Sequence, residues 1–85
     1  IRDTAVALAP VDRAEAEALV NSISGAALLR GARGTKPVRM KSVLDAVVAV
    51  SRIMASCESI AELDINPFIA RPDSCTAVDA RIVIA

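Results

Sequence analysis

Two apolar segments joined by a short turn place the strongest constraint on the fold of this chain. Residues 60–70 and 75–84 are rich in Ile, Val and Ala, and residues 71–74 (Arg-Pro-Asp-Ser) separate them. Pro at the second turn position followed by polar residues suits a type I turn, and four-residue hairpin loops are commonly built on that turn. The sequence therefore predicts an antiparallel β-hairpin.

The length of the turn determines which residues of the hairpin lie opposite each other. Directly opposed side chains share a face of the ribbon, as do residues two apart on one strand. One face is expected to pack on a core, and the other carries a polar cluster. A loop one residue longer or shorter would separate that cluster. The predicted pairs are Ala70 with Cys75, Phe68 with Ala77, Asn66 with Asp79, and Asp64 with Arg81.

Acidic and amide side chains are disfavoured inside Val/Ile-rich strands, so this polar cluster asks for an explanation. A bound Mg²⁺ with a phosphate ligand would supply one, because Mg²⁺ prefers oxygen ligands such as those of Asn66 and Asp79. A simpler interpretation is that this pair is exposed on the sheet or caps a turn. For Asp64 and Arg81 the simpler interpretation is a cross-strand ion pair worth about 0.2–1 kcal/mol.

The first half of the chain predicts a strand, a helix and a second short strand. Residues 3–9 are expected to form a strand that ends at Pro10. Asp12 and Glu15 have the spacing of a capping box at the start of a helix, and Gly25 is a typical helix stop. The apolar run that follows, residues 26–29, is interpreted as a brief strand.

A basic loop and a second helix complete the prediction. Residues 30–37 are rich in Gly and basic side chains and end in Pro, which favours a solvated connector over a phosphate-binding loop. Residues 39–56 show helical periodicity, with Asp45, Arg52 and Ser56 on the solvated side. The order β-α-β-α-β-β predicts an α+β, two-layer fold with two helices on one face of a small, mostly antiparallel sheet.

Composition limits the classes of function. The 85 residues suit one small domain, here residues 1–85, and the first residue is Ile, which suggests a piece of a larger protein. The net charge is zero, so nothing points to nucleic acid, and no apolar run approaches the roughly 20 residues that cross a membrane. Cys57 and Cys75 are interpreted as ordinary thiols of a cytoplasmic protein, a disulfide being the alternative.

The motifs Ala-Glu-Leu-Asp-Ile-Asn-Pro (residues 61–67) and Ala-Val-Asp-Ala-Arg (residues 77–81) resemble the end of the ATP-grasp domain of ADP-forming acyl-CoA synthetases. These enzymes are relatives of the nucleotide-binding subunit of succinyl-CoA synthetase. The entry Leu-Ala-Pro (residues 8–10), the loop at residues 28–34 and the second helix are also similar to that family. The resemblance therefore covers essentially the whole chain, and the first pair of motifs is its most specific part.

The resemblance implies that Asn66 and Asp79 bind the Mg²⁺ of Mg-ATP and that Asp64 lies near the phosphates. It implies a fragment of a ligase that converts an acid, CoA and ATP to acyl-CoA, ADP and phosphate. The partners it implies are ATP or ADP, the rest of the ATP-grasp domain, and a CoA-binding domain that carries a phosphorylated histidine. The chain itself has no His. The fragment is therefore expected to be inactive alone and to carry no catalytic residue of its own.

Two alternatives remain open from the sequence. The same ATP-grasp domain occurs fused to acetyltransferase domains in some protein acylation enzymes, so a nucleotide-binding or regulatory module without turnover is one of them. The other is a packing domain that dimerises through an exposed sheet edge.

Overall fold

The computed structural model describes residues 5–34, 36–65 and 68–84 and has an α+β fold, as the sequence predicts. Its helical elements are α1 (Arg13–Asn21), α2 (Ala26–Leu29), the 3-10 turn η1 (Ala32–Gly34) and α3 (Met40–Ser56). Its strands are β1 (Ile60–Ile65), β2 (Phe68–Ala70), β3 (Cys75–Ala77) and β4 (Ala80–Ile84). In the part of the chain so described, no helix is long and apolar enough to cross a membrane.

Helix α1 begins where the capping box places it. The Glu15 amide donates to Asp12 Oδ1 at 2.7 Å, and the Asp12 amide donates to Glu15 Oε1 at 3.2 Å. These bonds satisfy amides that have no partner within the helix. The helix ends at Asn21, with Ser22 as C-cap, which is earlier than the predicted stop at Gly25.

Residues 26–29 form a helical turn, so the prediction of a strand there is wrong. The Leu29 amide donates to the carbonyl of Gly25 at 3.3 Å, and the Arg30 amide donates to that of Ala26 at 3.1 Å. Ala and Leu are strong helix formers and neither is β-branched, so a short apolar run of these residues favours a turn of helix where no strand lies beside it. The following loop is closed by a bond of 2.8 Å from the Val38 amide to the Leu29 carbonyl.

The predicted strand at residues 3–9 is also wrong for its described part. Residues 5–8 have no regular secondary structure, and residues 3 and 4 lie outside the described ranges. A strand needs a neighbour for its backbone groups. No backbone hydrogen bond joins residues 5–9 to any other described residue. The side chains of Val6 and Leu8 are 93% and 91% exposed.

The hairpin has the predicted register but is divided into two ladders. β1 pairs with β4, including Asp64 opposite Arg81, and β2 pairs with β3, including Phe68 opposite Ala77 and Ala70 opposite Cys75. These three pairs are confirmed. The predicted pair of Asn66 with Asp79 falls between the ladders, and Asn66 lies outside the described residues.

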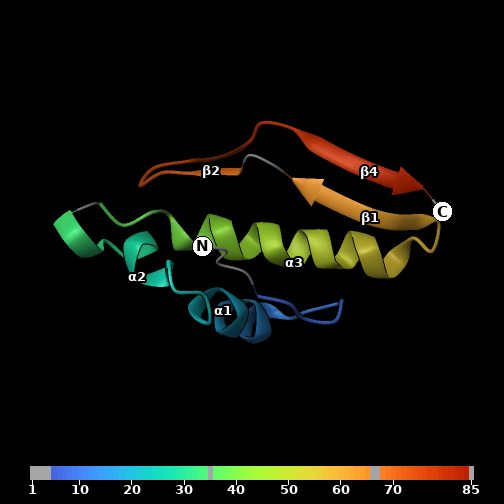
Figure 1. The fold of residues 1–85 in the computed structure, drawn as a ribbon, viewed down its shortest axis with the longest axis horizontal. Helices are drawn as coiled ribbons and strands as arrows, with labels where there is room; N and C mark the ends of the chain where they lie inside the picture. The colour runs from blue at the N-terminus through green and yellow to red at the C-terminus, as the bar shows by residue number, and fades with distance from the viewer. Residues whose placement is uncertain (1–4, 35, 66–67, 85) are drawn as a thin grey trace.

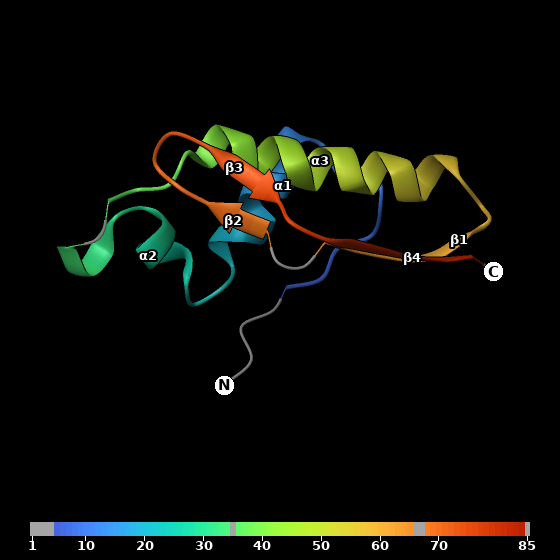
Figure 2. The ribbon, with the colours of Figure 1, turned by 90° about the horizontal axis from the view of Figure 1, so that it is seen from above.

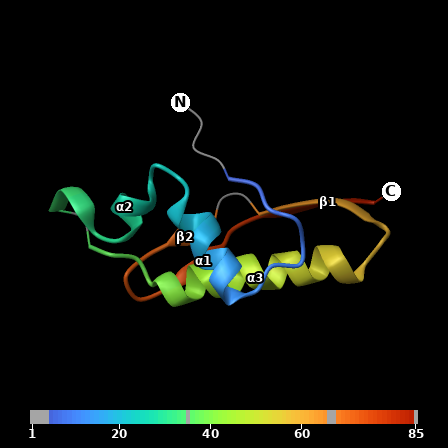
Figure 3. The same ribbon diagram turned by 90° about the horizontal axis from the view of Figure 1, so that it is seen from below.

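Helix α3 is the central element of the molecule. It lies against β1, and α1 packs on α3 on the side away from the β1–β4 ribbon, so both helices lie on one side of these strands (Figure 1). Figure 2 shows the β2–β3 hairpin over the N-terminal part of α3 and the β1–β4 ribbon along its C-terminal part. Figure 3 shows α1 crossing α3 on the opposite side. The predicted helix over residues 39–56 is thus confirmed to within one residue.

The buried core is small and lies between α1 and α3. Its four buried members are Val11, Ala16, Val20 and Leu44, and partly buried residues of α3 pack around them. The Ser51 hydroxyl of α3 accepts from the Val11 amide at 3.1 Å, which fixes the entry to α1. The accessible surface of the chain is 6099 Å². A compact protein of 8.8 kDa has about 4,800 Å². The chain therefore exposes about 1,300 Å² more surface than a compact protein of its mass.

Candidate functional site

The described residues of the predicted site lie where the two ladders of the hairpin meet. Asp64 is the penultimate residue of β1, and Asp79 belongs to the link between β3 and β4. Both side chains are exposed. Asn66, the third predicted residue, lies outside the described residues. The structure thus brings both predicted carboxylates, Asp64 and Asp79, to the same end of the β1–β4 ribbon.

Asp64 does not form the ion pair predicted with Arg81, although the two residues are directly opposed in the ladder. The Arg81 guanidinium lies 3.7 Å from the carboxylate of Glu62, its diagonal neighbour on the same face. The Arg81 and Glu62 side chains are 71% and 69% exposed, so solvent screens the pair and its contribution to stability is small. The long guanidinium side chain reaches the diagonal carboxylate, and this leaves the Asp64 carboxylate available to a ligand.

Asp79 is held by a local bond. Its Oδ1 atom accepts from the Ala80 amide at 2.9 Å, at the start of β4. No other described residue bonds to its second carboxylate oxygen. The bond orients the carboxylate and leaves one oxygen for a cation, which suits a residue that contributes one protein ligand to Mg²⁺.

The described residues alone do not make a complete metal site. No group of three or more His, Cys, Asp or Glu side chains in residues 5–34, 36–65 and 68–84 could hold a metal ion. Mg²⁺ usually takes one or two protein ligands and completes its shell with water and phosphate oxygens. With Asp79 as the one described residue of the predicted metal pair, the site therefore fits Mg²⁺ brought by a nucleotide better than a resident metal.

An apolar groove of about 570 Å³ lies beside this end of the ribbon. Residues 5–9, α3 and β1 form its walls, and Val6, Val47, Val50, Met54, Leu63 and Phe68 are among its lining residues. Among the described residues that line the groove, Asp64 is the one charged member, and the Ser51 hydroxyl is already bonded to Val11 and Val48. Sequence reasoning missed this groove because it assigned residues 3–9 to a paired strand.

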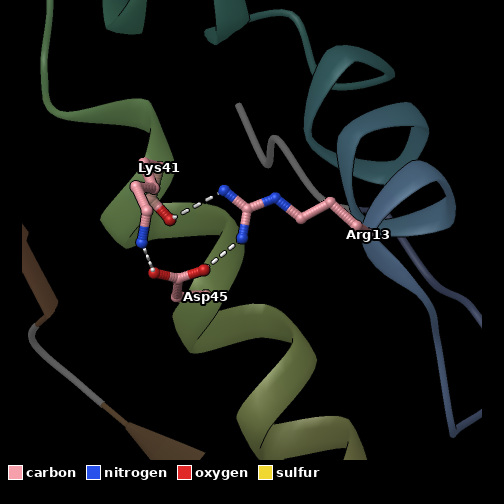
Figure 4. A network of polar contacts seen from close by, with 3 residues as sticks. All are labelled: Arg13, Lys41 and Asp45. Carbon is pink, nitrogen blue, oxygen red and sulfur yellow. Dashed lines mark hydrogen bonds and ion pairs between the residues drawn. The ribbon is translucent and has the colours of Figure 1, made fainter.

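A second polar cluster joins the two long helices. The Asp45 carboxylate accepts from Lys41 Nζ at 2.9 Å and pairs with the Arg13 guanidinium of α1, which also donates to the Lys41 carbonyl at 3.4 Å (Figure 4). Hydrogen bonds from Lys41 and from Arg13 lower the pKa of Asp45 below its ordinary value. The spacing of Lys41 and Asp45, four residues on one helix, is the only sequence signal for this cluster.

The basic loop is an exposed connector, as predicted. The Arg30 guanidinium donates to Asn21 Oδ1 at 2.7 and 3.2 Å, so it ties the loop to the end of α1. Three of its described residues have positive φ: Gly31 at 98°, Arg33 at 58° and Gly34 at 74°. The two glycines meet this backbone requirement without strain.

Comparison with known proteins agrees with the fold. The ATP-grasp domain family matches residues 1–84 of the chain. The β subunit of an ADP-forming acetate–CoA ligase from Pyrococcus furiosus is 36% identical over 84 residues, which are 99% of this chain and 36% of that subunit. An ADP-forming 4-hydroxybutyrate–CoA ligase from Nitrosopumilus maritimus is 32% identical over 96% of this chain and 12% of its own length.

Solved structures of one archaeal enzyme superpose closely on the chain. The dinucleotide-forming acetyl-coenzyme A synthetase 1 of Ca. Korarchaeum cryptofilum, in complex with coenzyme A and Ca-AMPCP, matches with a TM-score of 0.92 and 38% identity, over 99% of this chain and 37% of that one. A complex of the same protein with coenzyme A and Mg-AMPPCP matches with a TM-score of 0.91 and 37% identity, over 95% of this chain and 38% of that one. The chain spans little more than a third of these proteins. It belongs to the ATP-grasp domain family, and it matches the C-terminal part of that domain in ADP-forming acyl-CoA synthetases.

Proposed function

We propose that this chain supplies oxygen ligands for Mg-ATP in an ADP-forming acyl-CoA synthetase. The reaction converts an acid, CoA and ATP to an acyl-CoA, ADP and phosphate. In this proposal residues 1–85 are one structural unit, the C-terminal part of the nucleotide-binding domain of a longer protein. The similarity to acetate and 4-hydroxybutyrate ligases supports this reaction class.

The register of the hairpin is the observation that carries the proposal. Ile65 pairs with Ala80 at the end of one ladder, and Phe68 pairs with Ala77 at the start of the other. Two residues separate the ladders on each strand, so the two ladders have the same register, with no extra residue on either strand between them. Asn66 and Asp79 occupy matching positions in that count, which supports a shared ligand between them.

Each residue has a distinct role in this proposal. Asp79 provides a carboxylate oxygen and Asn66 an amide oxygen to Mg²⁺, and the free carboxylate of Asp64 lies beside the bound phosphates. Held by these residues, Mg²⁺ would supply charge neutralisation for the transferring phosphoryl group, a main source of catalysis in such reactions. The local bond from Ala80 to Asp79 holds that carboxylate ready for the cation.

The remaining groups come from elsewhere in the longer protein. The chain has no His, so a phosphorylated histidine would be supplied by another domain, together with the CoA site. One structure of the similar archaeal synthetase contains a phosphohistidine segment that points towards its nucleotide-binding site. The chain alone is accordingly expected to be inactive, and the longer protein to be cytoplasmic.

The test uses the longer protein with Asn66→Ala and Asp79→Asn. Each variant should raise the Mg²⁺ concentration for half-maximal activity by about tenfold or more, the equivalent of about 1.4 kcal/mol. Asp73→Asn, at the far end of the hairpin, makes the same charge change and should leave the Mg²⁺ requirement unaltered. Unchanged Mg²⁺ dependence in both variants would remove the metal assignment.

A parallel measurement distinguishes an enzyme with turnover from a nucleotide-binding module that has none. Calorimetric titration of Mg-ATP into the longer protein measures binding, and release of ADP in the presence of acid and CoA measures turnover. Binding accompanied by turnover is the expected result. Binding without turnover of any tested acid would favour the regulatory alternative.

A further inference from the structure

Basic side chains gather at one end of this chain, although its net charge is zero. Figure 1 and Figure 2 show η1, the segment that leads into α3 and the β2–β3 turn at the same end of the molecule. Six of the ten basic residues belong to this end, which we call the basic end: Arg30, Arg33, Lys36, Arg39, Lys41 and Arg71.

Two backbone hydrogen bonds hold three separate segments together at the basic end. The Val38 amide donates to the Leu29 carbonyl at 2.8 Å. The Arg39 amide donates to the Arg71 carbonyl at 2.9 Å. Each bond has an arginine at it or next to it, so Arg30, Arg39 and Arg71 come from adjacent segments. The fold thus brings together positive charges that are far apart in the sequence.

Most of these charges have no counter-ion in the described part of the chain. Lys41 pairs with Asp45, and Arg30 donates to the neutral side chain of Asn21. The carboxylate of the turn, Asp73, forms no ion pair with any described residue. Like charges held close together repel each other, so an anionic group from outside would stabilise this arrangement. Four basic side chains of this end are exposed and form no ion pair within the described ranges: Arg33, Lys36, Arg39 and Arg71.

The position of these charges favours an extended anionic partner over a small ligand. Neither the apolar groove nor a second hollow of about 390 Å³, between α1 and α3, is lined by any residue of the basic end. Small-molecule sites are concave and enclose most of their ligand. Exposed cations spread over several segments instead suit a partner that carries several negative charges along its length.

The surrounding side chains favour an acidic protein segment over nucleic acid or a membrane. Phe68, the one aromatic residue of the sequence, lines the apolar groove and gives no stacking surface for bases at the basic end. Stable membrane binding needs an apolar anchor besides a basic patch, and Leu28, 45% exposed, is the one exposed large apolar residue near this end in the described ranges. Carboxylates match the planar guanidinium group, which binds them through two parallel hydrogen bonds.

We infer that the basic end is the docking surface for a strongly acidic segment of a separate protein partner. Permanent interfaces are rich in apolar side chains, whereas this surface is charged, so the contact is reversible and sensitive to salt. Carboxylates of the partner pair with Arg33, Arg39 and Arg71. The inference goes beyond the proposed function, because none of these residues is assigned to Mg-ATP.

Fluorescence anisotropy of a labelled octaglutamate peptide, titrated with the longer protein, tests this inference. The peptide should bind, and binding should weaken as the ionic strength rises from about 0.01 M to about 0.15 M, since the Debye length falls from about 30 Å to about 8 Å. Arg39→Gln combined with Arg71→Gln should raise Kd at least about tenfold. Arg52→Gln combined with Arg81→Gln, which removes the same charge outside the basic end, should change Kd by less than about twofold.

The opposite results are equally clear. Failure of the peptide to bind, or an equal loss of affinity in the two double variants, would overturn the inference. Tighter binding of inorganic tripolyphosphate, or of vesicles that contain phosphatidylserine, than of the peptide would assign the surface to phosphate groups and would also overturn it.

Stability and nucleotide binding of the same protein complete the test. Removal of like charges relieves repulsion, so Arg39→Gln combined with Arg71→Gln should not lower the melting temperature. A large decrease would show that these arginines stabilise the fold, and it would overturn the inference. Mg-ATP binding should be unaltered in this double variant; its loss would place the arginines at the nucleotide instead. Intact peptide docking without Mg-ATP binding in the parent protein would refute the proposed function alone.

Discussion

Asp64 of β1 lies directly opposite Arg81 of β4, yet the Arg81 guanidinium pairs with Glu62 at 3.7 Å. The register of a ladder thus determines which Cβ atoms are neighbours, but a long side chain selects its own partner among the direct and diagonal positions. The result is a carboxylate at the end of β1 that no described cation neutralises. A substitution of Asp64 can therefore be used to compare an effect on ligand binding with an effect on the free energy of unfolding.

Asp64→Asn in the longer protein should weaken Mg-ATP binding by about tenfold, or about 1.4 kcal/mol, because under the proposed function it removes a negative charge close to the bound cation. The free energy of unfolding should change by less than about 0.5 kcal/mol, since the side chain is exposed. Calorimetry and urea unfolding measure the two quantities. Glu62→Gln, on the same strand and face, is the control and should leave Mg-ATP binding unaltered; equal weakening by both changes would contradict a specific role for Asp64.

Asp45→Asn should lower the thermal stability at neutral pH, and the difference from the parent sequence should disappear in acid. Hydrogen bonds from Lys41 and Arg13 lower the pKa of Asp45 from its ordinary value of 3.8. A depressed folded-state pKa contributes stability that is fully present above the unfolded value and is lost as the pH falls through the folded value. The two melting temperatures should therefore differ at pH 7 and converge below pH 3.8.

The control for this experiment is Asp73→Asn, in the β2–β3 turn. Its carboxylate forms no ion pair with any described residue. The melting temperatures of Asp73→Asn and the parent sequence should therefore not show a difference at pH 7 that disappears in acid. A difference between Asp45→Asn and the parent that persists unchanged into acid would show that the charge of Asp45 is not the source of its effect.

Leu44→Ala should destabilise the chain by about 2–5 kcal/mol, because truncating a buried Leu loses apolar burial and leaves a cavity. Leu44 is 6% exposed and belongs to the core between α1 and α3. Ile53→Ala on the same helix, where the native side chain is 45% exposed, should cost less than half as much. Urea unfolding, monitored by circular dichroism, measures the free energy of unfolding of both variants. An equal loss in the two variants would contradict the location of the core around Leu44.

Gly34→Ala should destabilise the chain by about 1 kcal/mol through the backbone alone. Gly34 has φ of 74°, and a Cβ atom built there would meet nothing within 4 Å, so steric overlap with neighbours plays no part. Gly34→Asn should cost less, because Asn tolerates this conformation better than Ala. The melting temperatures of the three sequences should fall in the order Gly, Asn, Ala at position 34. A lower melting temperature for Asn than for Ala would refute the backbone explanation.

The elements that sequence reasoning predicted correctly are those whose determinants are local. The capping box of Asp12 and Glu15 defines the start of α1, the helical period defines α3, and the length of the turn at residues 71–74 defines the register of the hairpin. Each depends on groups only a few residues apart. The candidate site shares this property, since Asp64 and Asp79 are related by that register.

The two incorrect strands show the limit of this reasoning. The run at residues 26–29 is too short for its period to distinguish helix from strand, and Ala and Leu favour the helical turn that forms. Residues 5–9 have the composition of a strand, but a strand exists only beside a partner, and no described residue offers one. The local sequence of residues 5–9 favours a strand, but it does not show whether a distant segment pairs with it.

The residues of the candidate site lie at the break between the two ladders of the hairpin, away from the core that stabilises the fold. Asp79 stands outside both sets of interstrand hydrogen bonds, and neither it nor Asp64 takes part in the core. Substitutions of Asp64 or Asp79 are therefore expected to change the free energy of unfolding very little. Under the proposed function, a substitution here would remove turnover while the architecture is retained, and the domain would then be a starting point for the evolution of a ligand sensor.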